Sequence, residues 1–274
     1  MIFLFIYKLS NIINYPKKMK YVYLHPPGTL CLYHAILHEI LNNQFSSFLE
    51  IGPGQGFLSE ILCKKGLYGI GIESSQISLN LLNKRMQNFV NKDQYKILNQ
   101  NVMEMKNDFS VDIAISVMVM EHIKNDYLFL ENIKALVRDN GMVLIAVPGR
   151  MDKWGIEDEI YGHFRRYEKK ELFEMMNNVG MKDVKVSSIG VPVSNMLFNI
   201  GNFLTRNSGV QKREKYNKDE QTNLSSVIEV KGKTYFPSIF KILLNNYTML
   251  PFVQLQKVFY RTEYGLTLLG VGRV

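Results

Sequence analysis

The chain has 274 residues, 46% of them hydrophobic, which suits one α/β domain with a substantial core and excludes a largely disordered protein. Its 33 basic and 25 acidic residues give a net charge of +8, but the basic residues are spread along the chain, so nucleic acid is only one of several partners that the charge allows. The two cysteines form no CxxC motif, which argues against a disulfide framework and a zinc site and favours a reducing cytoplasm.

The amino-terminal segment, "MIFLFIYKLSNIINYPKK", opens on six apolar residues. They are too few to span a bilayer, and no small-residue cleavage site follows them. We expect an N-terminal helix or a peripheral segment here. Elsewhere no run of 18 uncharged apolar residues occurs, so no transmembrane helix is predicted.

Strand-like apolar runs alternate with helical apolar spacing through the middle of the chain, which is typical of a parallel sheet covered by helices. We expect strands at 47–52, 68–73, 95–99, 112–117 and 142–147, a sixth in "KDVKVSSIG" and a last one in "YGLTLLGVGRV". Helices are expected at 56–65, 75–90, 126–138 and 168–178. The glycines of "DNGM" and "NVGM" are expected to end two of them.

A stretch of different character separates the sixth strand from the last. "SNMLFNIGNFL" and "PSIFKILLNNYTMLPFVQLQKVFY" have helical apolar spacing, whereas 206–234 is polar and charged, which predicts a loop. We therefore predict an N-terminal helical lid region at 1–44, an α/β domain formed by 45–191 and 263–274, and a helical insertion at 192–262 that caps the substrate.

The segment "FLEIGPGQGFLSEIL" places Gly52, Gly54 and Gly56 between a strand and a helix. Glycines at the first crossover of a sheet let a ligand lie against bare backbone. The dinucleotide fingerprint is GxGxxG, and here the third glycine comes one residue early, with Phe57 in its place. No Gly-Lys-Ser/Thr follows, so a phosphate loop is not indicated. The spacing alone predicts a ligand without identifying it.

Two acids extend this pattern. Glu73 ends the second predicted strand 17 residues after Gly56, where a carboxylate can accept both hydroxyls of a ribose. Glu50 stands at the end of the first strand, where it can face an ammonium group. The combination suits adenosine joined to an amino acid better than adenosine joined to a pyrophosphate.

Three segments in order, "EIGPGQG", "GIGIESS" and "VDIAISVMVMEHIKND", resemble motifs of the class I S-adenosylmethionine-dependent methyltransferases, over roughly 45–190 and the last strand. The resemblance implies an α/β fold with a Rossmann-like seven-stranded sheet, helices on both faces, an antiparallel last strand and a helical insertion before it. It also implies S-adenosyl-L-methionine as the cofactor, S-adenosyl-L-homocysteine as the product, and no required metal.

Carried over residue by residue, the resemblance implies that the three glycines wrap the methionine portion and that Glu50 faces its ammonium group. Glu73, with Ser74 beside it, would hold the ribose. Asn101 matches a position where the family often has Asp near the adenine amine, and its side-chain oxygen can accept a hydrogen bond from that amine. Val102 would pack beside the base.

Acceptor-side residues of this family follow the fourth and fifth strands, where "SVMVMEH" and "IYGHFRRYEKKEL" occur. The first stretch lacks both the Asn/Asp-Pro-Pro-aromatic sequence of base amino-methyltransferases and the Pro-Cys nucleophile of pyrimidine carbon methylation. Its Glu121-His122 pair resembles the "EH" of small-molecule and lipid-quinone O-methyltransferases. "GHFRRYEKKELFEMM" resembles a "GHxRRY" segment of enzymes that act on quinones, sugars or saccharide lipids.

His163 and His122 are the candidate general bases, because imidazole titrates near neutral pH. A structural role is the alternative for each: His122 can cap or pack at a helix start, and His163 can order the loop before the helix at 168. A structural or lid role is expected for the histidines of the N-terminal region, His25, His34 and His38.

Arg165 and Arg166 are candidates to bind a substrate carboxylate or phosphate, since a guanidinium group pairs with both. Alternatively, one of them forms a salt bridge with a glutamate of the following helix. Trp154 and Tyr161 are candidates to line the acceptor pocket, and a core or lid role is the alternative for Trp154.

We therefore predict a cytoplasmic methyltransferase acting on a small or lipid- or saccharide-linked acceptor, at oxygen. One alternative is an RNA-modifying methyltransferase, which the basic charge supports and the missing base-methylation motifs oppose, so nucleic acid is not expected as a partner. The other is a non-catalytic protein that has kept the fold. The sequence determines neither the acceptor nor the oligomeric state.

Peripheral membrane contact is a further prediction, made from the second helical stretch of the insertion. Apolar residues recur there at helical spacing, and Lys241, Lys257 and Arg261 could meet anionic headgroups. The alternative is that the same residues pack onto the core and close the active site.

Overall fold

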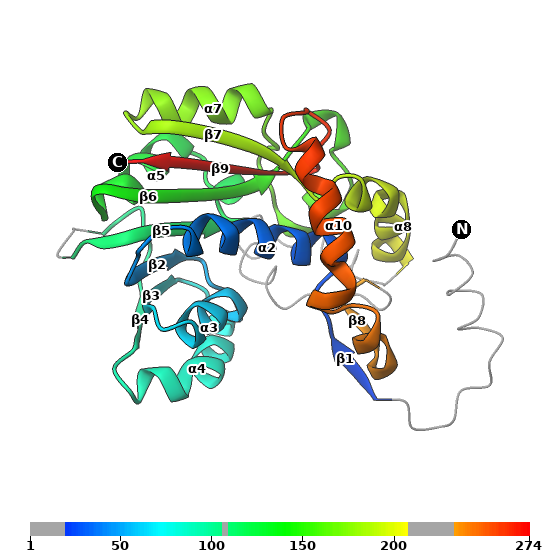
Figure 1. Ribbon diagram of the computed structural model, residues 1–274, viewed down its shortest axis with the longest axis horizontal. Helices are drawn as coiled ribbons and strands as arrows, with labels where there is room; N and C mark the ends of the chain where they lie inside the picture. The colour runs from blue at the N-terminus through cyan, green and yellow to red at the C-terminus, as the bar shows by residue number, and fades with distance from the viewer. Residues whose placement is uncertain (1–19, 106–108, 208–232) are drawn as a thin grey trace.

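The computed structural model describes residues 20–105, 109–207 and 233–274, and strands and helices alternate along most of them (Figure 1). In chain order the elements are β1 (Tyr21–Tyr23), α2 (Pro27–Leu41), β2 (Ser47–Ile51), α3 (Phe57–Lys64), β3 (Tyr68–Glu73), α4 (Gln76–Val90), β4 (Tyr95–Asn99), β5 (Val111–Val117), η1 (Met120–His122), α5 (Asp126–Ala135), β6 (Val137–Pro148), η2 (Met151–Lys153), α6 (Ile156–Tyr161), α7 (Lys169–Asn178), β7 (Lys182–Ile189), α8 (Val193–Asn207), β8 (Tyr235–Pro237), η4 (Ser238–Ile242), α10 (Asn246–Phe259) and β9 (Thr267–Arg273).

Seven strands form one sheet in the order β4-β3-β2-β5-β6-β9-β7. The strands from β4 to β6 pair in parallel, whereas β9 lies between β6 and β7 and is antiparallel to both. The predicted Rossmann-like sheet with an antiparallel last strand is therefore confirmed. The chain runs outward from β2 in one direction and from β5 in the other, and such a switch point leaves a crevice at the carboxyl ends of the strands.

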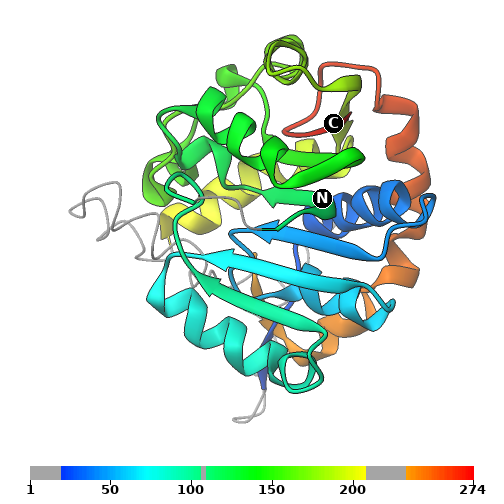
Figure 2. The same ribbon diagram turned by 90° about the vertical axis from the view of Figure 1, so that its left-hand side faces the viewer.

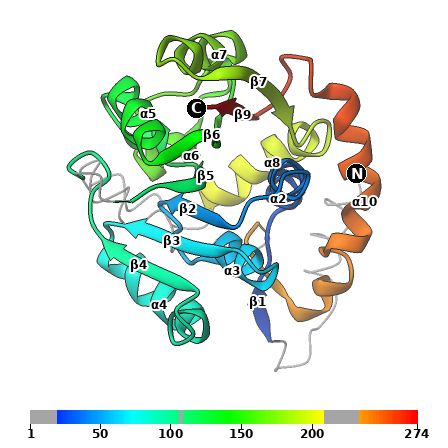
Figure 3. The same ribbon diagram turned by 60° about the vertical axis from the view of Figure 1, so that its left-hand side comes forward.

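The strands divide their apolar side chains between two cores, one on each face of the sheet. In β6, Val143 and Ile145 face the core that includes side chains of α5 and α7. The neighbouring Leu144 and Ala146 face the core that includes side chains of α2, α3 and α4. Figure 3 shows α5 and α2 on opposite sides of the sheet. Helices cover both faces because every central strand is apolar on both sides.

One predicted helix end is wrong. The helix expected at 126–138 ends at Ala135, and Gly141 of "DNGM" lies inside β6. Asn140 adopts the positive φ, +61°, that was expected of the glycine. Gly141 is needed for space, because a Cβ there would lie 2.7 Å from the main-chain oxygen of Asp112. Gly180 of "NVGM", with φ +78°, follows α7 as predicted.

Two three-residue strands join the N-terminal region to the insertion. β1 pairs antiparallel with β8, and the rings of Tyr21 and Tyr235 stack with centroids 5.6 Å apart. The sequence does not show this pairing, because strands so short carry no readable periodicity. The segment that was predicted to be an N-terminal helix or a peripheral segment lies outside the described residues, which begin at residue 20.

The helix at Pro27–Leu41, α2, belongs to the core rather than to a separate lid. Leu32 and Ile36 are buried against the sheet. On its other side, Leu30 and Cys31 pack against Met249 and Val253 of α10. Figure 2 shows α2 between the strands and α10.

The insertion contributes α8, β8, η4 and α10 between β7 and β9, and most of its predicted polar loop lies outside the described residues. Gln256 of α10 is fully buried. Its Oε1 accepts a hydrogen bond from the Gly190 amide at 2.9 Å, and its Nε2 donates to the Cys31 carbonyl at 3.1 Å. One side chain thus joins α10 to β7 and α2. No helix among the described residues is both long and apolar enough to cross a bilayer.

Replacing Gln256 by Leu should lower the free energy of unfolding by about 1–3 kcal/mol, because a buried amide and a buried carbonyl lose their partner. Urea titration followed by circular dichroism measures this. Gln254→Leu, at an exposed position of the same helix, is the matched control and should change stability by under about 0.5 kcal/mol. Equal effects of the two substitutions would contradict the joining role.

Candidate active site

A cavity of about 950 Å³ opens at the carboxyl ends of β2, β3, β5 and β6. One side is formed by the loop after β2 and the end of β3, and the other by α8 and by residues next to β1 and β8. This is the crevice expected from the strand order, and its size suits a cofactor and a small acceptor together.

The glycine loop forms the floor of the cavity. Gly52, Gly54 and Gly56 have φ values of +65°, +54° and +76°, a conformation that L side chains rarely adopt. A Cβ at Gly52 would lie 2.6 Å from a methyl of Val119. Gly52 and Gly54 line the cavity, whereas Gly56 starts α3 and packs close to Leu82. The three glycines are therefore required by conformation, and two of them face the ligand space.

Glu73 lies where the ribose contact was predicted. Its Oε2 accepts a hydrogen bond from the Gly54 amide at 3.1 Å, and its Oε1 accepts one from the Ser75 amide at 2.9 Å. Burial raises the pKa of Glu73, against these amides, which lower it. Ser74 beside it is exposed and lines the cavity. The loop and the acid thus hold each other in place.

Glu50 is not among the described residues that line the cavity, and its side chain is buried. Ser59 Oγ donates to Glu50 Oε2 at 2.5 Å and lies 2.8 Å from the Tyr95 hydroxyl. Burial raises the pKa of Glu50 to about 7. In this geometry Glu50 joins the end of β2 to α3, and its predicted contact with an ammonium group stays a prediction.

The predicted adenine contacts lie at the far end of the cavity. Asn101 and Val102 both line it, and Val102 is buried. Asn101 Oδ1 accepts a hydrogen bond from the Met103 amide at 3.0 Å, which leaves a second lone pair for a ligand donor. The position of the pair agrees with the predicted role.

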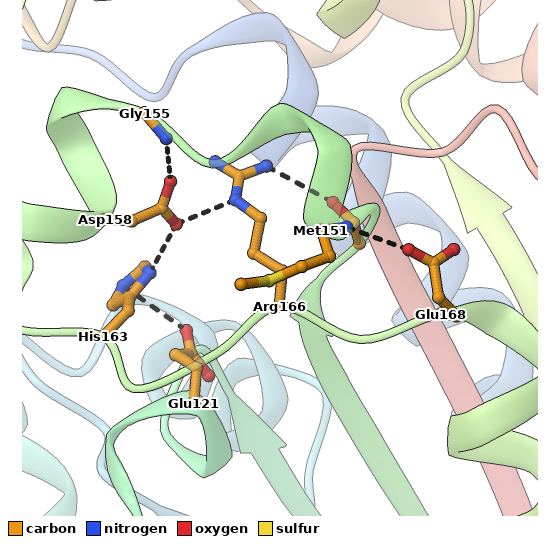
Figure 4. A network of polar contacts seen from close by, with 8 residues as sticks. Glu121, Met151, Gly155, Asp158, His163, Arg166 and Glu168 are labelled. Atoms are coloured by element: carbon orange, nitrogen blue, oxygen red, sulfur yellow. Dashed lines mark hydrogen bonds and ion pairs between the residues drawn. The ribbon is translucent and has the colours of Figure 1, made fainter.

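On the acceptor side, Asp158 of α6 binds three groups (Figure 4). Its Oδ2 accepts from the Gly155 amide at 2.8 Å, and its Oδ1 lies 2.8 Å from His163 Nδ1 and accepts from Arg166 Nε at 2.8 Å. Burial alone would raise the pKa of Asp158, but the hydrogen bonds from His163 and Arg166 keep it below its ordinary value. The residue fixes the orientation of the predicted base.

Glu121 and His122 approach the same histidine from η1. The rings of His122 and His163 are 4.8 Å apart, and Glu121 Oε1 lies 3.9 Å from His163 Nε2. Burial and the neighbouring His163 lower the pKa of His122 to about 3, whereas burial raises the pKa of Glu121 to about 7. Ligand-type atoms of the three residues lie within 4.8 Å of one another, close enough to contact one substrate group or one metal ion.

The remaining predicted substrate residues divide into two groups. Tyr161 and Arg166 line the cavity, and Arg166 also donates to the Gly149 carbonyl at 3.3 Å. Arg165 and Trp154 are not among the described lining residues. Arg165 Nη1 donates to Asp126 of α5 at 2.8 Å, and Arg166 pairs with Asp158, so the alternative of an ion pair with Glu168 or Glu171 is wrong for the described contacts. An acceptor contact through Arg165 is therefore not supported.

Sequence reasoning missed several lining residues. Lys233 forms an ion pair with Glu157, which also accepts a hydrogen bond from Thr205 Oγ1 at 3.0 Å. Lys233 and Glu157 both line the acceptor side. Their pairing joins distant segments, and no local pattern reveals it. Asp158 carries a readable signal, since it belongs to the acidic run of α6 and lies five residues before His163.

Leu197, Phe198 and Leu204 of α8 form an apolar wall beside these polar groups, with the Arg166 guanidinium 5.9 Å from the centre of the Phe198 ring. His25 also lines the cavity, and its ring contacts those of Tyr23 and Phe57; its structural or lid role stays a prediction. The cavity therefore combines three surfaces. They are the glycine loop with Glu73, which suits a nucleoside, an acid–base cluster of Glu121, His122 and His163, and the apolar wall of α8.

A family described as "Methyltransferase domain" matches residues 27–186. Among curated proteins, the ubiquinone biosynthesis O-methyltransferase of Pelagibacter ubique is 28% identical over 98 residues, which are 36% of this chain and 40% of the relative. The chain thus spans less than half of that relative's length.

Two solved structures share the fold at low sequence identity. The cyclase SpnF matches with a TM-score of 0.59 at 11% identity, over 99% of this chain and 93% of its own. Phosphoethanolamine N-methyltransferase 2 of Haemonchus contortus, in complex with S-adenosyl-L-methionine, matches with a TM-score of 0.56 at 14% identity, over 88% of this chain and 52% of its own. Because one of the two is a cyclase, the fold alone does not determine the reaction.

The titration of Glu121 gives a prediction about stability. Its pKa in the folded protein, about 7, exceeds its ordinary 4.5, so its contribution to stability is present at low pH and is lost as the pH rises through about 7. Glu121→Gln removes this loss. The unfolding free energy of E121Q relative to wild type should therefore rise between about pH 5 and pH 8, by on the order of 1–3 kcal/mol.

Thermal unfolding at a series of pH values measures this difference. Glu131→Gln, an exposed substitution on α5, is the control and should leave the difference unchanged across the series. A difference between E121Q and wild type that stays constant with pH would contradict a raised pKa at Glu121.

Proposed function

The chain belongs to the methyltransferase-domain family, and from this premise we propose that it transfers a methyl group from S-adenosylmethionine to a hydroxyl of a small or lipid- or saccharide-linked acceptor. The observation that carries the proposal is a single cavity that joins the glycine loop and Glu73 to Glu121, His122 and His163. Groups suited to a nucleoside and groups suited to proton transfer therefore face one ligand space.

The cavity floor fits this cofactor in shape and in polarity. Gly52 and Gly54 present main chain without side chains, and at Gly52 a Cβ would meet Val119. Glu73 offers carboxylate lone pairs to the ribose hydroxyls, and Val102 offers an apolar surface to the adenine. Asn101 would accept a hydrogen bond from the adenine amine.

When bound, S-adenosylmethionine supplies a methyl group on a positively charged sulfur. The protein then has to align the acceptor oxygen with that methyl and to remove the hydroxyl proton. Leu197, Phe198 and Leu204 would hold an apolar part of the acceptor and exclude water, while the acid–base cluster faces its hydroxyl. No part of this arrangement needs a metal ion.

Oxygen is the proposed methyl acceptor because the curated relatives are O-methyltransferases and the cluster can remove a proton. The lining cations argue against a nucleic acid. Arg166 pairs with Asp158 and Lys233 pairs with Glu157, so within the described cavity neither cation is left to bind phosphate groups. The apolar wall of α8 suits a small or amphiphilic molecule better.

The outer face of the insertion suits a membrane surface, and we propose that the enzyme works in the cytoplasm at the face of a membrane. Met249 and Val253 bury one side of α10 against α2. The other side and η4 expose large apolar side chains, of which Ile239, Ile242, Leu243, Phe252 and Leu255 are 40–69% exposed. Lys241 and Lys257 are exposed on the same elements. Apolar and basic groups together favour weak, reversible binding to anionic lipid.

S-adenosylmethionine and S-adenosylhomocysteine should bind the chain, and NAD should not. Gly54→Asp should abolish binding, because its side chain would fill the space next to Glu73 and add a like charge. Glu73→Ala should weaken binding by about 1–3 kcal/mol, because the ribose hydroxyls lose their acceptor. Isothermal calorimetry with S-adenosylhomocysteine measures both, with Glu131→Ala as a control. Unchanged affinity in both variants would contradict the assignment.

The intact chain should float with liposomes that contain anionic lipid at low salt, and less so with neutral liposomes. Lys241→Glu/Lys257→Glu should reduce flotation several-fold, because two attractive charges become repulsive. Lys96→Glu/Lys182→Glu makes the same charge change at exposed positions of β4 and β7 and should float like wild type. If no variant floats, or both double mutants float equally, α10 only closes the active site and the acceptor is soluble.

A further inference from the structure

One buried carboxylate in the cavity lacks the hydrogen bonds that such a group normally has. Glu121 is fully buried and lines the acceptor side. Neither of its oxygens has a hydrogen-bond partner among the described residues. By contrast, Asp158 nearby accepts three hydrogen bonds, and Glu157 accepts from Lys233 and Thr205.

A buried carboxylate without a hydrogen-bond donor lowers stability, and such a group is explained by a catalytic role or by a ligand, water or ion that completes it. Stability alone does not account for Glu121, since a neutral side chain of the same shape would avoid the cost. Glu121 lines the same cavity as the apolar side chains of α8. The missing partner is therefore expected to come from the acceptor.

The groups around Glu121 restrict what that partner is. His163 Nε2 lies 3.9 Å from Oε1, beyond hydrogen-bond distance, and the His122 ring adjoins that of His163. On the other side of His163, the charges of Asp158 and Arg166 neutralise each other. An acceptor hydroxyl between Glu121 and the imidazoles would give the carboxylate a donor and would add no charge to the site.

We infer that Glu121, rather than either histidine, takes the proton of the acceptor hydroxyl, and that His163 is a positioning residue held by Asp158. This inference rests on the proposed function. His163 Nδ1 is committed to Asp158 at 2.8 Å, which fixes the ring so that Nε2 points toward Glu121. The ring would then hold the acceptor oxygen in line with the methyl.

In the inferred step, methyl transfer and proton transfer occur together. The acceptor oxygen forms a bond to the methyl carbon as the carbon–sulfur bond breaks, and that electron pair stays on sulfur, which becomes neutral. Glu121 takes the hydroxyl proton and becomes a neutral carboxylic acid. The positive charge of the sulfonium and the negative charge of Glu121 thus cancel in one step, inside a site that excludes water.

The pKa values of Glu121 and His122 agree with this geometry. With a pKa raised to about 7 by burial, Glu121 is partly ionised at neutral pH and is a stronger base than an ordinary carboxylate. His122, with a pKa lowered to about 3, is a weak base in this site. The turnover number should therefore rise with pH through about 7 and then level off, because the ionised carboxylate is the active form.

The test compares wild type, Glu121→Gln, Glu121→Asp and His163→Gln. Formation of S-adenosylhomocysteine is measured from about pH 5.5 to pH 9 with a panel of hydroxylated aromatic acceptors, 3,4-dihydroxybenzoate among them. Calorimetry with S-adenosylhomocysteine shows that each variant keeps the cofactor site. Carbon-13 NMR of labelled glutamate carboxyls adds a readout independent of turnover: wild type should show two resonances that titrate near pH 7, from Glu50 and Glu121, and one of them should be absent from E121Q.

E121Q should lose on the order of 10²-fold or more in turnover together with the rise through pH 7. E121D, which keeps a shorter carboxylate, should lose less and keep the rise, and H163Q should be slower but should also keep it. A rise that survives in E121Q and vanishes in H163Q would overturn the inference and leave the proposed function intact.

Two further outcomes are distinguishable from that one. If wild type binds S-adenosylhomocysteine but turns over no hydroxylated acceptor, the proposed function fails, and the inference fails with it. If EDTA abolishes turnover and magnesium restores it, the carboxylate serves a cation and the inference is overturned. Turnover that resists EDTA and depends on Glu121 supports it.

Discussion

The site depends on one constraint of the sheet, which is that the parallel strands β2, β3, β5 and β6 end at the same edge. The glycine loop follows β2, Glu73 ends β3, Glu121 follows β5, and the segment with Asp158 and His163 follows β6. Because the strand order reverses between β2 and β5, these ends surround a crevice rather than a packed core. Residues far apart in sequence meet there because each of them follows a strand that ends at this edge.

The four acids that line the crevice differ in the hydrogen bonds that they accept. Asp158, Glu157 and Glu73 all have hydrogen-bond donors that hold them in place. Glu121 alone among these four acids is left without a hydrogen bond in the described chain. The three hydrogen-bonded acids hold the site in its geometry, whereas Glu121 is available for chemistry. The burial of Glu121 lowers stability at a position where it serves the function.

The resemblance to methyltransferases implied the seven-stranded sheet with its antiparallel last strand and drew attention to the segment with His163. Local patterns were sufficient for the individual strands, the glycine loop and the position of Glu73, because strand period, turn glycines and motif spacing are all short-range signals. They failed where the outcome depends on packing. The β1–β8 pairing and the Lys233–Glu157 ion pair join distant segments. Gly141 was misread as a helix end because its role is to avoid a clash with the neighbouring strand. The state of Glu121 follows from burial, which sequence spacing does not reveal.

The central claim, that this cavity transfers a methyl group to oxygen of a small or amphiphilic molecule, is tested most directly by following the methyl group itself. The protein is incubated with S-adenosylmethionine carrying a trideuterated methyl and with separated lipid, saccharide, small-molecule and RNA fractions of a cell extract. Mass spectrometry then locates the label. The account predicts a labelled methoxy group in the lipid, saccharide or small-molecule fraction. Label on RNA, on nitrogen or carbon, or on no molecule at all would contradict it.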